Sequence, residues 1–454
     1  MKTNFGKITC FLAIFLFFMM IASCFEPWAG DQGDATTGTV TINLGGTISR
    51  VTYPPTQGML DDMKYVVSFD RETGSSPSPI TFENVPSGEL KVTLPLALWT
   101  ITVEAHFNNE LYAQGSGRIR LAPNDTNSLD IFMAPVLPAG TNTAWVQMPN
   151  GQIDGGHPTL NVALETIPTT GGIYTIWLTM HQTPAVPYNL SLYASGTRIT
   201  LRTASQTGVN ISFTGTGSLF TVQTGVTLVL TNSVHLFGNT DNTAASLVSI
   251  SGGTFIMEDG SITMNSGGGV RINSGSFLME DGIIFSNGNT TSTSTFGGGV
   301  RMQTGTFNMS GGVIFDNTAR MGGGVYIDNG TFTMTGGTIS TNTASVVSGI
   351  GGDGGGVHVV GFTLDGTVSN RGQFIRQNGG VIYGGNEVEM NANTAAIKYG
   401  DLAGGHAIFI EGVGDAGSPP TMHRPSRGWN NTVNSNFDSV AASGWDYQEF
   451  NFAW

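Results

Sequence analysis

Cysteine is almost absent from this chain of 454 residues, which has two, Cys10 and Cys24. Cys10 lies inside an apolar leader, so the mature chain keeps Cys24 alone and an internal disulfide is excluded. Charge is scarce too, at 11% of residues. Packing and hydrogen bonds between backbone segments must therefore hold the fold together.

Positive charge is the scarcer sign. Lysine and arginine total 18 against 32 acidic residues, which gives a net charge of −14. Loss of Lys2 and Lys7 with the leader brings it to −16. Such an acidic surface argues against nucleic acid and anionic lipid head groups as main partners.

Catalytic motifs are missing as well. The sequence contains no HExxH, no GxSxG and no cysteine or histidine spacing typical of a metal site, and its seven histidines are scattered. It therefore predicts no catalytic residue and no cofactor.

Glycine, in contrast, is abundant. The 65 glycines are about twice the usual share, which indicates many tight turns. Apolar residues still make up 39% of the chain, and serine, threonine and asparagine are frequent. This composition predicts an all-β protein rather than a disordered chain.

The first residues are typical of an export signal. Lys2 and Lys7 precede an apolar run over residues 11–22, and small residues follow it. The run is too short for a transmembrane helix. We therefore expect the protein to be exported.

The end of this run carries a further motif. Ile-Ala-Ser-Cys at residues 21–24 resembles the lipobox of bacterial lipoproteins. The resemblance implies a signal peptide over residues 1–23, a lipid on Cys24 and a polar tether over residues 24–37. Ordinary signal cleavage beside an incidental cysteine is the alternative.

Residues 38–136 carry short runs in which apolar and polar residues alternate, separated by Gly, Pro, Asn and Asp. Seven such strands in about 100 residues predict a β-sandwich. The segment at residues 96–135, with WTITVEAHF and ELYAQGSGRIRL, resembles prealbumin-like (Ig-like) and carboxypeptidase-regulatory-like sandwiches of exported bacterial proteins. The resemblance implies a spacer or a carbohydrate-facing module.

A repeat follows this segment. GGGVRINSGSFLMEDGIIFSN (267–287), GGGVRMQTGTFNMSGGVIFDN (297–317) and GGGVYIDNGTFTMTGGTISTN (322–342) share the positions of a valine, a phenylalanine, a methionine and an asparagine. The copies keep one length, whereas the linkers between them vary. A fixed core with variable insertions is the mark of a solenoid.

Each copy divides into three short strands at glycines, such as VYI, TFTM and TIS in the third. Three strands per turn predict the coils of a right-handed parallel β-helix over residues 140–412, with equivalent strands about 4.8 Å apart. Its phenylalanines are expected to form a buried column and its asparagines an amide ladder. The members are Phe255, Phe277, Phe307 and Phe332 for the column, and Asn265, Asn287, Asn317 and Asn342 for the ladder.

The copies resemble the GGA[ILV] and FxxN repeats of polymorphic outer-membrane proteins and, more loosely, those of pectin-lyase-like adhesins. GGGV recurs at 267–270, 297–300, 322–325 and 354–357, and IFSN, IFDN and ISTN stand where these families have FxxN. Glycine replaces their alanine, and isoleucine their phenylalanine. The resemblance implies a β-helix that serves as an adhesin or as a structural surface protein.

An open stack of strands needs a cap at each end. HPTLNVALETIP has Leu160, Leu164 and Ile167 at helical spacing after a proline, which predicts a capping helix over residues 158–167. The aromatic tail within residues 413–454 suits the other end. A sorting element is the alternative for this tail.

Four carboxylates that recur at equivalent positions are the metal candidate. Stacked one coil apart, they offer the oxygen ligands that Ca²⁺ prefers. A solvated turn is the alternative. They are Glu258, Asp259, Glu280 and Asp281.

The residue that follows GGGV is the binding candidate. Its neighbours in the strand are apolar and face inward, so strand alternation turns it outward. Coils in register align these residues in one exterior row, whose guanidinium groups suit the carboxylates or sulfates of a glycan or an acidic protein loop. A merely solvated row is the alternative. This arginine row consists of Arg271, Arg301, Tyr326 and His358.

These expectations describe a non-catalytic lipoprotein of the cell envelope, adhesin-like or structural, anchored to the outer membrane or cell surface by the lipid on Cys24. Its partners are then the membrane and glycans or host and extracellular proteins. A polysaccharide lyase or glycoside hydrolase on a pectin-lyase-like β-helix is the alternative. An inverting glycosidase needs two carboxyls about 6.5–9.5 Å apart, and the sequence singles out no such pair.

Overall fold

The described part of the fold is almost entirely β, as the sequence predicts, and it includes the short helix α3 (Leu160–Thr166). The chain falls into two compact units, of which the first takes the described residues up to Met133 except Leu111–Ala113, and the second takes Leu111–Ala113 and the described residues from Ala134 onward. The computed structural model describes residues 37–44, 62–72, 79–122, 126–129, 131, 133–137, 140–204, 208–231, 233–289, 295–348, 350–360, 372–376, 380–383, 392–399, 402–403, 408–413 and 447–452.

The N-terminal unit contains two sheets. In one, β1 pairs antiparallel with β4 and parallel with β7. In the other, β3, β2, β5 and β6 lie in that order. The strands are β1 (Thr37–Leu44), β2 (Lys64–Arg71), β3 (Ile80–Val85), β4 (Gly88–Pro95), β5 (Leu98–Phe107), β6 (Glu110–Arg120) and β7 (Thr126–Ser128).

Alternation gives each of these sheets one apolar face. In β1, Val40 and Ile42 are buried between exposed or half-buried polar residues, and Trp99 and Ile101 are buried in the same way in β5. The indole N–H of Trp99 donates to the carbonyl of Pro95 at 2.9 Å, so this large side chain is buried with its polar atom satisfied.

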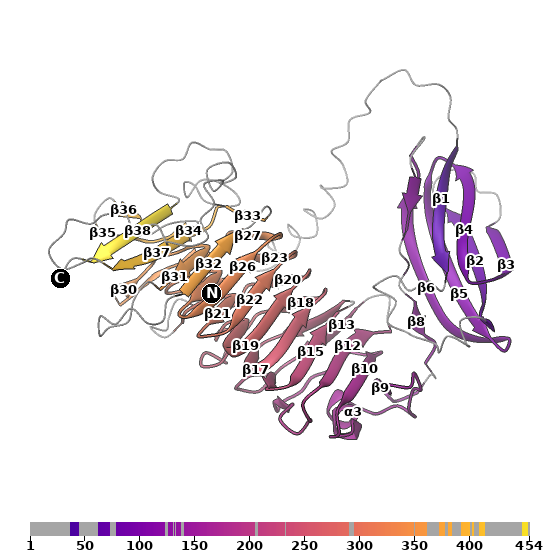
Figure 1. The fold of residues 1–454 in the computed structure, drawn as a ribbon, viewed down its shortest axis with the longest axis horizontal. Coiled ribbons are helices and arrows are strands. Elements are labelled where there is room, and N and C mark those ends of the chain that lie inside the picture. Colours follow the sequence, from indigo (N-terminus) through magenta and orange to yellow (C-terminus); the bar gives the residue numbers. More distant parts are fainter. Residues whose placement is uncertain are drawn as a thin grey trace, which may run out of the picture. The chain divides into compact units, whose positions relative to one another are not determined.

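The second unit is built mainly from parallel strands that lie side by side from β10 to β38 (Figure 1). The longest sheet follows the path β38-β37-β31-β25-β21-β19-β17-β15-β12-β10-β9, and another runs β13-β16-β18-β20-β23-β27-β33. A third, short sheet has the order β24-β28-β34. Strands one repeat apart in sequence are therefore neighbours in space.

The strands of the longest sheet include five that lie off its main path, namely β11, β14, β22, β26 and β32. Its strands are β9 (Ala144–Gln147), β10 (Gly172–Leu178), β11 (Tyr188–Asn189), β12 (Thr197–Thr203), β14 (Phe220–Gln223), β15 (Val226–Leu230), β17 (Val248–Met257), β19 (Val270–Met279), β21 (Val300–Met302), β22 (Thr306–Met309), β25 (Val325–Ile327), β26 (Gly330–Met334), β31 (Val357–Val359), β32 (Gly372–Arg376), β37 (Ile408–Val413) and β38 (Tyr447–Phe452).

The remaining strands are shorter. They are β8 (Ala134–Pro135), β13 (Val209–Ser212), β16 (Val234–Phe237), β18 (Ser261–Thr263), β20 (Ile283–Phe285), β23 (Val313–Phe315), β24 (Thr318–Ala319), β27 (Thr338–Ser340), β28 (Thr343–Ala344), β29 (Val346–Val347), β30 (Ile350–Gly351), β33 (Val381–Ile382), β34 (Thr394–Ala395), β35 (Ile397–Tyr399) and β36 (Leu402–Ala403).

The predicted phenylalanine column is confirmed. Phe277, Phe307 and Phe332 are fully buried, with ring centroids 4.8 and 4.4 Å apart in successive pairs and nearly parallel planes. Phe255 stacks below this group at 5.2 Å, and Phe374 continues it at 5.0 Å. Because the spacing equals the distance between paired strands, stacking the backbone also stacks the rings.

The predicted asparagine ladder is confirmed too. The backbone N–H of Asn265 donates to Oδ1 of Asn287 at 3.2 Å, and that of Asn287 donates to Oδ1 of Asn317 at 3.1 Å. Asn342 continues the series and donates to Asn393 at 2.9 Å. All five side chains are buried. These amides satisfy backbone groups at a turn that apolar residues would leave unpaired.

The residue before each of the four asparagines predicted for the ladder has a left-handed backbone. Met264, Ser286, Asp316 and Thr341 have φ angles of 60°, 52°, 53° and 52°. This conformation is uncommon outside glycine and asparagine, so the turn is held by the ladder rather than by the preference of these residues.

Helix α3 lies within the predicted range. The Thr159 side chain caps it by accepting from the N–H of Val162, and Leu160 and Leu164 are buried in the same core cluster as the strands. At the C-terminal end of the long sheet, β38 pairs in parallel with β37, so part of the aromatic tail forms a strand there.

Candidate functional site

The arginine row is aligned as the repeat predicts. Arg271 pairs with Arg301 across β19 and β21, Arg301 with Tyr326 in β25, and Tyr326 with His358 in β31. The flanking valine, isoleucine and methionine residues of these strands are fully buried or nearly so. One residue from each of four successive repeats therefore lies in a single line.

The expectation that the whole row faces solvent is wrong for two members. Arg271 and Arg301 are half-buried, but Tyr326 is 8% exposed and His358 is 0% exposed. The Tyr326 ring stacks on the His358 ring at 5.0 Å and meets the Phe296 ring at 4.9 Å. Strand alternation predicts the direction in which a side chain points. It does not predict the neighbouring rings that bury Tyr326 and His358.

Two residues outside the row, Phe296 and Arg320, lie next to its arginines. Phe296 and Arg320 lie where the chain approaches the glycines of the next GGGV, and Phe296 is bridged to Met321. The Phe296 ring has the Arg301 guanidinium carbon 4.8 Å from its centroid and that of Arg320 at 4.4 Å. These distances are typical of cation–π contacts. We call Arg271, Arg301 and Arg320 the arginine cluster.

The arginine cluster carries unbalanced positive charge. None of its members is in an ion pair with another described residue. Burial lowers the pKa of Arg301, and the charges of Arg271 and Arg320 act in the same direction, while Tyr326 and Asp328 oppose them. An anion placed here would relieve that repulsion.

The arginine cluster also has unused donors. The Nε atoms of all three arginines are buried and have no hydrogen-bond partner within the described residues. Arg271 uses one Nη2 hydrogen, donated to Oε1 of Gln303 at 3.1 Å. Guanidinium forks of this kind suit carboxylate and sulfate oxygens.

The four carboxylates proposed for Ca²⁺ do not form a metal site. Glu258 lies 3.4 Å from Arg198 and 3.6 Å from Arg202, and Asp259 accepts from the N–H of Ser233 at 3.1 Å. Asp281 accepts from the N–H of Gly282, while Glu280 is exposed. Within the described ranges, no three His, Cys, Asp or Glu side chains are grouped to hold a metal.

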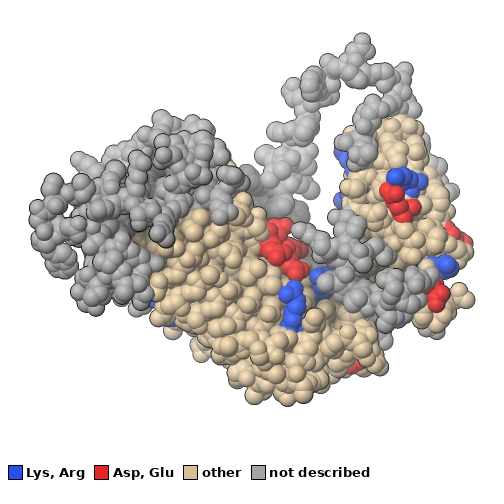
Figure 2. Space-filling view, in the orientation of Figure 1, with Lys and Arg blue, Asp and Glu red and all other residues tan. Residues whose placement is uncertain are grey.

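Glu258 instead forms an ion pair with the buried Arg202. Burial lowers the pKa of this arginine to about 10, and the Glu258 carboxylate opposes that shift. Arg202 is 3% exposed, so the pair supports a buried charge rather than a ligand site. In the view of Figure 2, charged side chains are few and most of the described surface is uncharged.

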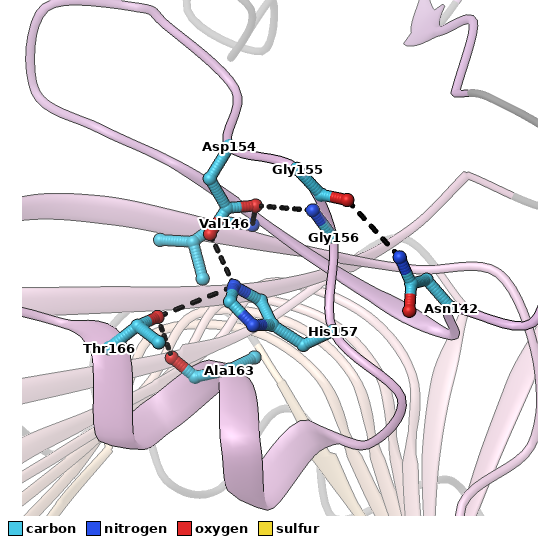
Figure 3. Close-up of polar contacts among 8 residues, drawn as sticks. All are labelled: Asn142, Val146, Asp154, Gly155, Gly156, His157, Ala163 and Thr166. Atoms are coloured by element: carbon cyan, nitrogen blue, oxygen red, sulfur yellow. Dashed lines mark hydrogen bonds and ion pairs between the residues drawn. The ribbon is translucent and has the colours of Figure 1, made fainter.

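A second polar group lies beside α3 (Figure 3). His157 Nε2 contacts Oδ2 of Asp154 and lies 3.4 Å from the hydroxyl of Thr166. Both contacts use one ring nitrogen, and Thr166 donates its proton to the carbonyl of Ala163 at 2.8 Å. A nucleophile triad needs the acid and the hydroxyl on opposite ring nitrogens, so this group fastens the chain before α3 instead.

Cys24 lies outside the described residues, as do residues 1–23, predicted to be a signal peptide, and most of residues 24–37, predicted to be a tether. Among the helices that are described, none combines the length and apolar character needed to cross a bilayer.

Comparison of the chain with protein-family models, with curated proteins and with solved structures finds no match.

Proposed function

We propose that residues 140–412 form a right-handed parallel β-helix with three strands per coil, and that residues 38–136 form a β-sandwich. Parallel, in-register pairing of equivalent strands from successive repeats supports the β-helix. Crossovers between parallel strands are right-handed in about 98% of cases, which supports the hand. Two sheets with one apolar face each support the sandwich.

The function that fits best is a non-catalytic lipoprotein of the cell envelope, adhesin-like, that binds anionic glycans through the arginine cluster. Export and anchoring through Cys24 rest on the leader and on the lipobox-like Ile-Ala-Ser-Cys. The outer membrane or the cell surface is the proposed location.

One observation carries the binding proposal. Arg301 and Arg320 lie against the Phe296 ring, and Arg271 pairs in register with Arg301. None of the three is in an ion pair with a described residue, in a chain with a net charge of −14. Like charges held this close together cost stability, and an anion that joins them would lower that cost. The Phe296 ring adds an apolar surface next to the charges, which suits a sugar ring that carries a carboxylate or sulfate.

The test compares binding of immobilised polygalacturonate, heparin and neutral dextran. The parent should bind at least one of the two anionic glycans and release it with rising salt, because exposed charge contacts are screened. Arg271→Gln with Arg301→Gln should weaken that binding about 100-fold, since each charged hydrogen bond contributes about 1.5–3 kcal/mol.

Lys64→Gln with Lys91→Gln is the matched control, because it removes the same charge from two exposed lysines of the N-terminal unit. The control should bind as the parent does. Equal binding by the arginine variant, or equal loss in both variants, would contradict the proposal. Release of unsaturated or reducing ends from either anionic glycan would favour the enzyme alternative.

A further inference from the structure

A cavity of about 420 Å³ lies at the start of the second unit, beside the hairpin that β9 opens. Val136, Leu137 and Ile153 contribute aliphatic walls, and Asn142, Trp145 and Asp154 contribute polar groups. Its size and its mixture of apolar walls with a few polar atoms match small-molecule sites in proteins.

Trp145 is the unusual member of this cavity. Its side chain is 5% exposed, yet its indole N–H is buried without a hydrogen-bond partner among the described residues. A buried donor left unpaired costs free energy, so such groups are rare without a ligand or water to serve. Trp177, its register partner in β10, differs because its N–H donates to Oε1 of Gln147 at 3.1 Å.

The loop against Trp145 is built to hold the indole in place. Oδ1 of Asp154 accepts from the N–H groups of Val146 and Gly156, at 3.0 and 3.1 Å (Figure 3). Gly156 has φ of 78°, and a Cβ there would lie 2.7 Å from the Trp145 ring, so only glycine lets the loop lie on the indole. The donor is therefore fixed by its surroundings.

Asn142 provides the complementary acceptor. Its Nδ2 donates to the carbonyl of Gly155 at 3.1 Å, which leaves Oδ1 as the other polar atom of this amide (Figure 3). Because Asn142 lines the same cavity as Trp145, the two side chains offer a ligand hydroxyl one acceptor and one donor. The negative charge of Asp154 beside them disfavours an anionic ligand.

We propose that this cavity binds a neutral sugar residue, with a hydroxyl between Trp145 and Asn142 and the C–H surface of its ring against Leu137 and Ile153. A peptide is disfavoured because β9 is already paired on both sides, with β10 and with the segment of Ile153 and His157. No open strand edge is therefore offered there for backbone pairing. This proposal is independent of the arginine cluster.

The test titrates the full chain with the methyl glycosides of glucose, galactose and N-acetylglucosamine, and with triglycine, followed by saturation-transfer NMR. At least one glycoside should bind with a Kd of about 1 mM or tighter. Trp145→Phe keeps a ring in place but removes the donor, and should weaken that binding about tenfold. Trp177→Phe, the same change outside the cavity, should leave it unchanged.

Gly140→Leu gives a second variant that does not disturb Trp145. A Cβ at Gly140, which lines the cavity, meets no atom of the described residues within 4 Å, so the backbone accepts a larger side chain at this position. This variant should abolish sugar binding with the parent's melting temperature. Absence of binding by all three glycosides, binding of triglycine instead, or equal sugar affinity in Gly140→Leu would overturn the proposal.

Discussion

Asn317 makes two hydrogen bonds to a single atom of Asn342. Its backbone N–H lies 3.0 Å from Oδ1 of Asn342, and its side-chain Nδ2 lies 3.0 Å from the same oxygen. Asn287 repeats both contacts with Oδ1 of Asn317, at 3.1 Å each. Each amide oxygen therefore serves two donors of the preceding repeat, and each rung depends on the next.

Asn317→Ala should destabilise the second unit by about 3 kcal/mol or more. The change removes the acceptor of two buried donors on Asn287, and each unsatisfied group costs about 1–3 kcal/mol. Urea denaturation measures the loss. Asn308→Ala removes an exposed asparagine of the same repeat and should stay within about 0.5 kcal/mol of the parent. Equal costs for the two changes would show that the ladder does not contribute.

Phe307→Ala should cost about 3–5 kcal/mol, because it opens a cavity in the middle of the phenylalanine column. Phe315 offers a control in the same repeat. It is half-buried on the outward face of β23 and stacks on Phe285 at 5.2 Å, so Phe315→Ala should cost about 1 kcal/mol. The two denaturation midpoints test this, and a larger loss for Phe315→Ala would reverse the assignment of inner and outer faces.

Met264→Asn should stabilise the protein by about 1 kcal/mol. Met264 combines φ of 60° with a side chain 49% exposed, and asparagine accepts this backbone more readily than methionine does. Met180→Asn makes the same change at another exposed methionine, which is outside the positive-φ residues, and should give no gain. Thermal melting compares the three proteins. A gain at both sites would assign the effect to polarity instead of backbone strain.

Cys24→Ala should abolish membrane attachment in a bacterial host, because the thiol that accepts the lipid is gone. Cys10→Ala is the control, since it leaves the lipobox-like Ile-Ala-Ser-Cys intact. Detergent partitioning and metabolic labelling with a fatty acid report the outcome. Labelling that survives Cys24→Ala would exclude lipidation at this residue.

Recurrence made the interior of the second unit predictable. Phe277, Phe307 and Phe332 stand at one spacing from GGGV, so a single assumption about strand pairing places them all in one column. Helix α3 was predictable for a different reason, since its apolar residues follow a helical period. Both signals are local in sequence or repeat at a constant interval.

The outer face was less predictable because its contacts come from the variable linkers. Strand alternation placed Arg301 and Tyr326 in one row. It did not predict that the Phe296 ring contacts both the Arg301 guanidinium and the Tyr326 ring. The pairing of Glu258 with Arg198 joins residues 60 positions apart that belong to different repeats. The spacing of residues within one repeat does not predict contacts between distant segments.

The role of Trp145 could not be predicted from the sequence, for a third reason. It occurs once, in a strand that pairs antiparallel with β10 before the GGGV copies begin. Its importance depends on an unpaired donor and on the close approach of Gly156, and both are properties of the folded chain alone.

Asn342 and Asn393 are bonded rungs although 51 positions separate them, against 25 for Asn317 and Asn342. The pairing of Thr343 with Thr394 resumes in the same register after this detour. The number of residues between two hydrogen-bonded asparagines can therefore change without changing the register of the strands. The connections between paired strands are therefore places where segments of different length can be exchanged while the strands and the asparagines keep their register.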